Sequence, residues 1–404
     1  MKALEGIKVV DLTNFESGPT CTEDLGFLGA DVYKIERVPK SGTSGRNRSS
    51  AKGDTIAFTV LNANKKSISV DMKSPEGKEI IWKLIDECDV LVENMGPGSV
   101  DRLGFSYEAV HKRNPRMIYT SIKGFGKGSP WENYPAFDPI AQATGGAMAL
   151  NGPLDGPPTL IGPNVGDYGV GHFTCIGILA ALIEREKTGE GQFVEGAMQD
   201  VIACCIRGHF EPFYTRGIRR VGNYMPLEDV APHNLYRCKG DKDTDCALIY
   251  CSRVPSSTNY VDLMKIIGRE DLAEDPRMAT PQSRFEYREM LDQAITDWTS
   301  VRDKYEVMDV VASAGIPCGA VLGLDEVIDN EFLRSRGTIV DIQHPYYGKI
   351  AMPTFPIKMS GSKVEVTQAP NVGAHTKEVL QGVLGFSDEE VAALKEKGIV
   401  GYSN

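Results

Sequence analysis

Several features that would point to common classes of site are missing from this chain of 404 residues. No two cysteines have the CxxC spacing, and the six histidines show neither an HExxH nor a His-x-His pattern, so we expect no metal site. The sequence contains no GxxxxGK[ST] phosphate loop and no GxSxG nucleophile elbow. The short GxG at 169–171 lacks the third glycine of a nicotinamide-binding fingerprint. These absences argue against metalloenzymes, P-loop enzymes, serine hydrolases and nicotinamide-dependent enzymes.

Positive charge is also in short supply, because 44 lysines and arginines face 55 aspartates and glutamates for a formal net charge of −11. Nucleic-acid binding needs a basic face, so we expect no nucleic-acid partner. No apolar run approaches the roughly 18 residues of a membrane span, so we expect no membrane association. The first six residues (MKALEG) lead directly into a predicted strand, and the nine cysteines are scattered. We therefore expect no signal peptide and a cytoplasmic protein with reduced thiols.

Predicted strands and helices alternate along the first part of the chain. The strands are expected at 7–13, 31–37, 67–72, 90–93 and 117–123. This alternation predicts an α/β fold with a doubly wound, mostly parallel sheet. We expect a large domain made of 1–224 and 321–404, with a smaller α+β domain at 225–320 between its two parts. Ligands of such sheets bind beyond the carboxyl ends of the strands, where the loops 14–20, 37–52 and 94–98 lie.

One acidic residue, Asp167, lies among glycines in the segment 164–171 (NVGDYGVG). The apolar spacing of 172–183, directly after it, predicts a helix that is buried on most sides. Glycines would allow main chain or a ligand to approach the carboxylate closely. Aspartate is also a favoured N-cap residue, so the residues alone favour a capping role over a catalytic one.

A group of positive charges lies in the segment 34–48, where five cations outnumber the one acid, Glu36. The cations are Lys34, Arg37, Lys40, Arg46 and Arg48, and Lys52, Lys65, Lys66 and Arg102 follow them in the sequence. In an acidic protein this group indicates an anionic ligand such as a phosphate. A solvated surface loop would have the same composition, so both interpretations stay open.

Eight segments, spread over nearly the whole chain, are specific in combination. They are GIKVVDLT, SGPTCTEDLGFLGADVYKIER, NKKSISVDMKSPEGK, VENMGPGSVDRLGF, SIKGFG, VGDYGVG, GILAALIEREKTGEGQ and GIPCGAV. With them the sequence closely resembles class III CoA-transferases, the family of formyl-CoA and crotonobetainyl-CoA:carnitine CoA-transferases. The resemblance changes the interpretation of Asp167, which matches the catalytic aspartate of that family in the same loop before the same helix.

The resemblance implies a Rossmann-like large domain and an enzyme that moves CoA from an acyl-CoA donor, such as succinyl-CoA, to a carboxylic acid without a metal. Asp167 would attack the thioester and then carry CoA as an aspartyl thioester. The implied CoA contacts are Ser17, Arg37, Val70, Asn94, Met95, Arg102 and Lys123. The family architecture further implies an interlocked dimer, whose partner is either an identical chain or a homologous subunit.

This chain departs from formyl-CoA transferases at three places. Their first loop has a glutamine where this chain has Glu16, which we take as a second catalytic acid of open role. A tyrosine and a lysine of their site correspond to Phe137 and Pro135, and their glycine-run loop is absent, with 222–229 in its region. Oxalate and formate are therefore unexpected substrates. The expected substrate pocket is aromatic, lined by Phe15, Phe137, Tyr168 and Tyr224, and would suit a larger acyl group such as benzylsuccinate.

An α-methylacyl-CoA racemase is the alternative, because these enzymes share the fold and the CoA site. They abstract a proton with a histidine that directly precedes an aspartate, and here Phe137 precedes Asp138. Without that base, racemisation is disfavoured. A non-catalytic subunit of a hetero-oligomer is a further alternative, and the presence of Asp167 argues against it.

Overall fold

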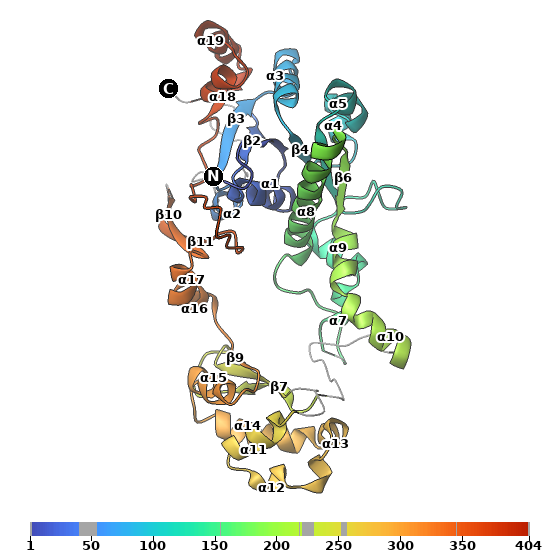
Figure 1. The fold of residues 1–404 in the computed structure, drawn as a ribbon, viewed down its shortest axis with the longest axis vertical. Helices are drawn as coiled ribbons and strands as arrows, with labels where there is room; N and C mark the ends of the chain where they lie inside the picture. The colour runs from blue at the N-terminus through green and yellow to red at the C-terminus, as the bar shows by residue number, and fades with distance from the viewer. Residues whose placement is uncertain are drawn as a thin grey trace. The chain divides into compact units, whose positions relative to one another are not determined.

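A computed structural model describes residues 2–39, 55–153, 155–217, 219, 230–251, 257–344 and 346–402. The chain forms two compact units (Figure 1). The first consists of Met1–Gly152, Pro158–Arg219 and Ser335–Asn404. The second consists of Pro153–Pro157 and Arg220–Arg334.

The first unit is built on a seven-stranded sheet with the strand order β12-β3-β2-β1-β4-β5-β6. The strands are β1 Lys8–Leu12, β2 Asp31–Glu36, β3 Lys65–Val70, β4 Val90–Glu93, β5 Ile118–Lys123, β6 Phe193–Ala197 and β12 Val400–Gly401. Neighbouring strands from β3 to β6 pair in parallel, and β12 pairs antiparallel with β3. The predicted mixed α/β fold with a mostly parallel sheet is therefore confirmed.

The strand order reverses between β1 and β4, which are neighbours in the sheet. From β1 the chain continues outward to β2 and β3, and it then returns to add β4, β5 and β6 on the other side of β1. At such a switch point the crossovers lie on opposite faces of the sheet and leave a crevice beyond the carboxyl ends of the strands. The loops after β1 and β4 border this crevice.

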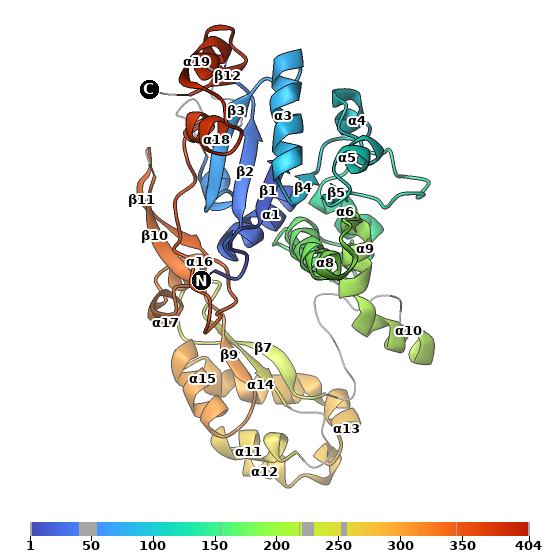
Figure 2. The ribbon, with the colours of Figure 1, turned by 45° about the horizontal axis from the view of Figure 1, so that its top comes forward.

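Helices cover both faces of the sheet (Figure 2). Within β1, Val9 packs in one core layer and Val10 in the other, as the alternation of side chains along a strand requires. The layer of Val10 contains α3 Pro75–Glu87, α5 Tyr107–Arg113, α18 Thr376–Gly382 and α19 Asp388–Glu396. The layer of Val9 contains α1 Ser17–Phe27, α6 Asp138–Thr144, α8 Val165–Thr188 and α9 Met198–Cys205. Burial on both faces explains why the strands read as short apolar runs.

The longest helix, α8, has 24 residues and ends at Gly189, whose φ of +80° gives the left-handed C-cap that glycine favours. Contrary to expectation, its length and composition would also allow it to cross a membrane. Its residues Val170, Ile178 and Leu182 are buried in the core layer that it shares with α1. Packing against a sheet and a neighbouring helix accounts for this buried face. Phe173, Ile176 and Ile183 are exposed on the remaining surface of the helix, so the expectation of a helix buried on most sides was wrong.

Short elements complete the first unit. They are α2 Ile56–Val60, α4 Ser99–Leu103, α7 Ala147–Leu150, the 3₁₀ turn Arg207–His209, α10 Phe210–Arg216 and the hairpin of β10 Ile339–His344 with β11 Gly348–Pro353.

The second unit has an antiparallel three-stranded sheet with a helical layer packed on it. Its strands are β7 His233–Arg237, β8 Cys246–Tyr250 and β9 Cys318–Ala320. Its helices are α11 Asn259–Ile266, α12 Glu270–Ala273, the 3₁₀ turn Pro276–Met278, α13 Pro281–Glu286, α14 Arg288–Thr299, α15 Lys304–Ser313 and α16 Leu324–Ile328. Helix α17, Glu331–Ser335, lies at its boundary with the first unit.

Candidate functional site

The two loops at the switch point are joined by the side chain of Asn94, the first residue after β4. Its amide nitrogen donates to the carbonyl oxygen of Asn14 (2.7 Å), and its Oδ1 accepts the N–H of Asn14 (2.8 Å). The same nitrogen donates to the hydroxyl oxygen of Ser17 (3.2 Å), the first residue of α1. Asn94 therefore fixes the entrance of α1 against the end of β4.

A buried ionic cluster holds the same loop from below. Asp11 of β1 is fully buried and accepts hydrogen bonds from the N–H of Thr13 (2.8 Å) and the hydroxyl of Thr22 (2.7 Å). It also pairs with Lys34 (3.8 Å) and Lys65 (3.2 Å). Burial opposes the charge of Asp11, but the two ammonium groups and the hydroxyls outweigh it and lower the pKa of Asp11 to about 2.

The ammonium groups of this cluster also bind main chain. Lys34 donates to the carbonyl oxygen of Thr13 (3.0 Å), and Lys65 donates to that of Pro19 (3.0 Å). Lys66, the next cation, pairs with Asp31 and Glu378 at 3.4 and 3.2 Å. The sequence analysis grouped these three lysines with cations that could bind an anionic ligand. That grouping was wrong, because carboxylates of the chain itself neutralise the three lysines.

Asp167 is the third residue of α8 and does not cap the helix. The N-cap residue is Asn164, whose side chain makes no capping hydrogen bond. Asp138, the first residue of α6, supplies the cap instead, because its Oδ1 accepts the N–H groups of Gly166 (2.6 Å) and Asp167 (3.3 Å). The N–H groups of the first helical turn have no partner within the helix, so this carboxylate satisfies two of them. The expectation of a capping role for Asp167 was therefore wrong.

Gln142 holds the capping carboxylate in place. Its Nε2 donates to Oδ2 of Asp138 (2.6 Å), and its Oε1 accepts the N–H of Ile161 (2.9 Å). Asp138 and Gln142 are 3% and 1% exposed. This pair was missed from the sequence. The Asp-Pro start of α6 is a helix-start signal, but nothing in it indicates that the carboxylate caps a second helix.

The carboxyl group of Asp167 has an unusual pKa for a surface-accessible aspartate. Burial raises this pKa most, and the neighbouring carboxylates of Glu16 and Asp138 raise it further. Hydrogen bonds from the Ser17 side chain and the main chain of Asp138 oppose the shift, and the resulting pKa is about 6. Asp167 is half-buried, so it remains open to a ligand while it is partly withdrawn from water.

Glu16 lies beside Asp167 and is held by Asn164, the N-cap residue of α8. The Nδ2 of Asn164 donates to Oε2 of Glu16 (2.7 Å). Burial, and after it the neighbouring carboxylate of Glu16, raises the pKa of Tyr168 to about 12. Both catalytic residues predicted from the sequence, Asp167 and Glu16, therefore lie in one cluster with Ser17.

The aromatic residues predicted to line the substrate pocket are next to this cluster. The rings of Phe15 and Phe137 pack edge to face with their centroids 5.7 Å apart. Their side chains are nonetheless 73% and 59% exposed. Phe15 has a φ of +63°, a left-handed conformation that is uncommon for an aromatic residue. Tyr224 lies outside the described residues.

Lys123, predicted as a CoA contact, is largely occupied within the protein. Its ammonium group donates to Glu93 (2.8 Å) and to the carbonyl oxygen of Met95 (2.6 Å). Glu93 is 1% exposed and also accepts the N–H of Met95 (2.8 Å). Lys123 therefore orders the loop after β4, and its charge is matched by a buried acid that the sequence analysis did not identify.

The remaining predicted CoA contacts differ in exposure. Arg37, at the end of β2, and Arg102, in α4, are exposed. Arg102 donates to the Ser99 hydroxyl (2.8 Å), and no carboxylate pairs with it in the part of the chain that the structure describes. Met95 is half-buried against the core, whereas Val70 is fully buried within it. Only the main chain of Val70 can therefore face a ligand. Lys40, Arg46, Arg48 and Lys52 lie outside the described residues.

Comparisons with known proteins agree on one family. The family described as "CoA-transferase family III" matches residues 4–376. A protein named formyl-CoA:oxalate CoA-transferase from Bradyrhizobium sp. (strain ORS 278) is 39% identical, over 98% of this chain and 97% of its own. Another with this name, from Streptomyces coelicolor, is 40% identical over 99% of both chains. Among solved structures, a CAIB/BAIF family protein from Brucella suis superposes with a TM-score of 0.82 at 27% identity and covers 94% of this chain and 99% of its own.

Proposed function

The chain belongs to CoA-transferase family III, and from this we propose that it moves CoA from an acyl-CoA donor to a free carboxylic acid through a thioester on Asp167. The observation that carries the proposal is the position of Asp167. A half-buried carboxylate with a pKa of about 6 lies in the first turn of α8, beside the switch-point loops. Above that pKa it is an ionised nucleophile that is only partly shielded by water.

The reaction needs no net proton transfer. An oxygen of Asp167 attacks the donor thioester carbonyl, and the CoA thiolate leaves to give a mixed anhydride. The thiolate then attacks the Asp167 carbonyl carbon, which releases the donor acid and forms the aspartyl-CoA thioester. The acceptor carboxylate attacks this thioester and expels the thiolate. The thiolate finally attacks the acceptor carbonyl of the new anhydride, which gives the product acyl-CoA and restores the Asp167 carboxylate.

Neighbouring residues would position the nucleophile. The Ser17 side chain and the main chain of Asp138 favour the ionised form of the Asp167 carboxylate, and we propose that they orient it. The N–H groups of Gly166 and Asp167 are occupied by Asp138. A developing oxyanion would therefore need other donors, and the Ser17 hydroxyl is suitably placed to be one.

The two exposed arginines are suited to the charged end of CoA. Arg37 and Arg102 carry planar guanidinium groups, which match phosphate oxygens in charge and geometry. Asn94 and Met95 lie on the loop after β4, and Asn94 is hydrogen-bonded to Ser17. We assign Lys123 to the support of this loop, because Glu93 already neutralises its charge.

The relatives are named for formyl-CoA and oxalate, whereas we propose a larger acyl group for this chain. Succinyl-CoA is our proposed donor, and an aromatic acid such as benzylsuccinate is our proposed acceptor. The exposed ring pair of Phe15 and Phe137 supports this, because it offers apolar area beside the nucleophile. A racemase gains no support, because the carboxylate of Asp138 is buried in its capping role and Phe137 is not a base.

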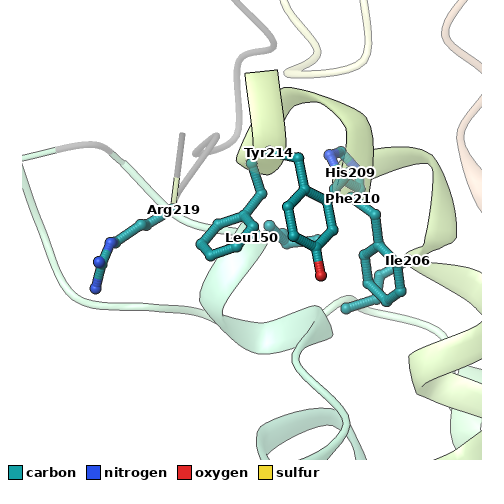
Figure 3. A pocket seen from close by; sticks show the side chains of 7 residues that line it. Leu150, Ile206, His209, Phe210, Tyr214 and Arg219 are labelled. Atoms are coloured by element: carbon teal, nitrogen blue, oxygen red, sulfur yellow. The ribbon is translucent and has the colours of Figure 1, made fainter. Parts of the chain in front are cut away.

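We further propose that the protein acts in the cytoplasm as an interlocked dimer with an identical or homologous subunit. Exposed apolar residues of the first unit support a partner surface. On α8 they include Phe173, Ile176 and Ile183, which are 46%, 60% and 64% exposed. An open apolar pocket also lies between α7 and α10 (Figure 3). Its lining residues are Leu150, Ile206, His209, Phe210, Phe213, Tyr214 and Arg219.

The test of the proposed function is an exchange assay read by mass spectrometry. The purified protein is incubated with succinyl-CoA and a panel of acids that includes benzylsuccinate, phenylacetate and oxalate, and new CoA thioesters are identified by mass. We expect a new thioester with at least one aromatic acid and none with Asp167→Asn. Full exchange by Asp167→Asn, or proton exchange at the α-carbon of a 2-methylacyl-CoA with no CoA transfer, would overturn the proposal.

A further inference from the structure

Glu16 introduces a fixed negative charge beside the nucleophile, and its placement bears on the choice of acceptor. We propose that Glu16 is a specificity-determining residue that excludes acids with a second carboxylate directly attached to the reacting one, and admits acids whose adjacent carbon is uncharged. This inference rests on the proposed CoA transfer through Asp167. It concerns which acids can enter the site, whereas the mechanism of transfer stays the same.

A hydrogen bond ties Glu16 to the residue that precedes α8, the helix that carries Asp167. Glu16 directly precedes Ser17, whose side chain lies close enough to Asp167 to lower the pKa of its carboxyl group. Asn164, three residues before Asp167, donates to Oε2 of Glu16 at 2.7 Å. Tyr168, the residue after Asp167, lies near enough to Glu16 for that carboxylate to raise the pKa of its hydroxyl group. The Glu16 carboxylate therefore cannot move far from the start of α8 without loss of its hydrogen bond to Asn164.

The partners of Glu16 leave its charge in place. Asn164 is a neutral donor and Tyr168 a neutral neighbour, and the other titratable groups of the cluster, Asp167 and Asp138, are acids. Lys34 and Lys65, the cations held beneath the loop, are paired with Asp11. No cation pairs with Glu16 among the described residues. Within the part of the chain that the structure describes, the site therefore presents a carboxylate with no cationic partner to whatever binds at Asp167.

An acceptor must bring its own carboxylate to the carbonyl carbon of the aspartyl thioester. In oxalate the second carboxylate is bonded directly to the first, so it must also enter this cluster. Like charges at short distance in a partly buried site repel strongly, and such repulsion is a common means of rejecting a wrong partner. In succinate or benzylsuccinate the second carboxylate is separated by carbon atoms and can turn away from Glu16.

The site also offers an apolar environment for the carbon atom next to the reacting carboxylate of the acceptor. Phe15 precedes Glu16 in the loop, and its ring packs on that of Phe137. Both rings are largely exposed, so a methylene or aryl carbon next to the reacting carboxylate can pack against them. The Glu16 carboxylate and the two rings would thus both favour an acid whose adjacent carbon is uncharged.

The inference is tested with Glu16→Gln, because glutamine keeps the shape of the side chain and an oxygen that can accept from Asn164. With succinyl-CoA as donor, kcat/KM is measured for oxalate and for phenylacetate. We expect the oxalate-to-phenylacetate ratio to rise at least about tenfold in Glu16→Gln. Glu16→Asp, which keeps the charge, should stay within about twofold of the wild-type ratio. The control is Glu186→Gln, an exposed acid elsewhere on α8, which should leave the ratio unchanged.

The outcomes separate this inference from the proposed function. If wild type and Glu16→Gln both transfer CoA to phenylacetate with the same acid preference, Glu16 does not select the acceptor and the inference is overturned. If wild type transfers CoA to no acid, or if Asp167→Asn remains active, the proposed function itself fails. An equal rise of the ratio in Glu186→Gln would also overturn the inference, because it would reflect net charge rather than position.

Discussion

Replacing Asp167 by asparagine should stabilise the protein at neutral pH while it abolishes CoA transfer. The carboxyl group has a pKa of about 6 in the folded protein and an ordinary value of 3.8. The fold therefore favours the protonated acid, and ionisation of Asp167 costs stability as the pH rises from 3.8 to 6. Asparagine has nearly the same shape and carries no charge, so it avoids this cost.

The size of the effect follows from the two pKa values. Each unit of difference corresponds to about 1.4 kcal/mol, so the full cost above pH 6 is about 3 kcal/mol. At pH 5 the folded protein still holds most of its Asp167 protonated, and linkage gives a cost of about 1.5 kcal/mol. The gain in unfolding free energy of Asp167→Asn over wild type should thus be about twice as large at pH 8 as at pH 5.

The assay is urea unfolding of both proteins at pH 5 and pH 8, followed by circular dichroism, with subunit concentration held constant. Comparison of the two proteins at each pH removes the contributions of other buried groups such as Glu23, whose pKa burial raises to about 8. A variant that is less stable than wild type at pH 8, or a gain that does not grow with pH, would refute the electrostatic account of this site.

Three further results are expected. In wild type, kcat should rise with pH through about 6 as Asp167 ionises, and in Glu16→Gln this limb should lie at lower pH, which a pH–rate profile measures. Asp138→Ala should lower the unfolding free energy by about 1–2 kcal/mol and reduce kcat, because α8 loses its cap and Asp167 its orientation; an unchanged kcat would contradict this. Arg102→Ala should raise KM for acyl-CoA about tenfold with little change in kcat. Lys123→Ala should chiefly destabilise the protein, by about 3 kcal/mol, because the buried carboxylate of Glu93 loses its counter-charge.

The core of the fold was predictable because its strands have a clear signal in the sequence. Segments such as VVDL in β1 and VLVE in β4 are buried on both faces, so they appear as short apolar runs between turn residues. The end of α8 was predictable for a similarly local reason, since Gly189 adopts the left-handed conformation that stops a helix. The order of the strands was not predictable from the residues, because nothing local specifies which strands pair.

The composition of the site was predictable from the family resemblance, but its supporting contacts were not. Asp138 caps a helix that begins 27 residues after it in the sequence, and the contact depends on how α6 and α8 pack. Likewise, counting cations could not distinguish Lys65, which is buried against Asp11, from Arg102, which is exposed. Such distinctions depend on long-range packing, which decides where each charge finds its partner.

The proposed mechanism requires that Asp167 carries CoA during transfer. The most direct measurement is the mass of the peptide that contains Asp167, after brief incubation of the protein with succinyl-CoA and rapid digestion. We predict a CoA thioester on Asp167 that disappears when an acceptor acid is added and never forms in Asp167→Asn. CoA transfer at full rate with no adduct on Asp167, or with an adduct on another residue, would contradict the account.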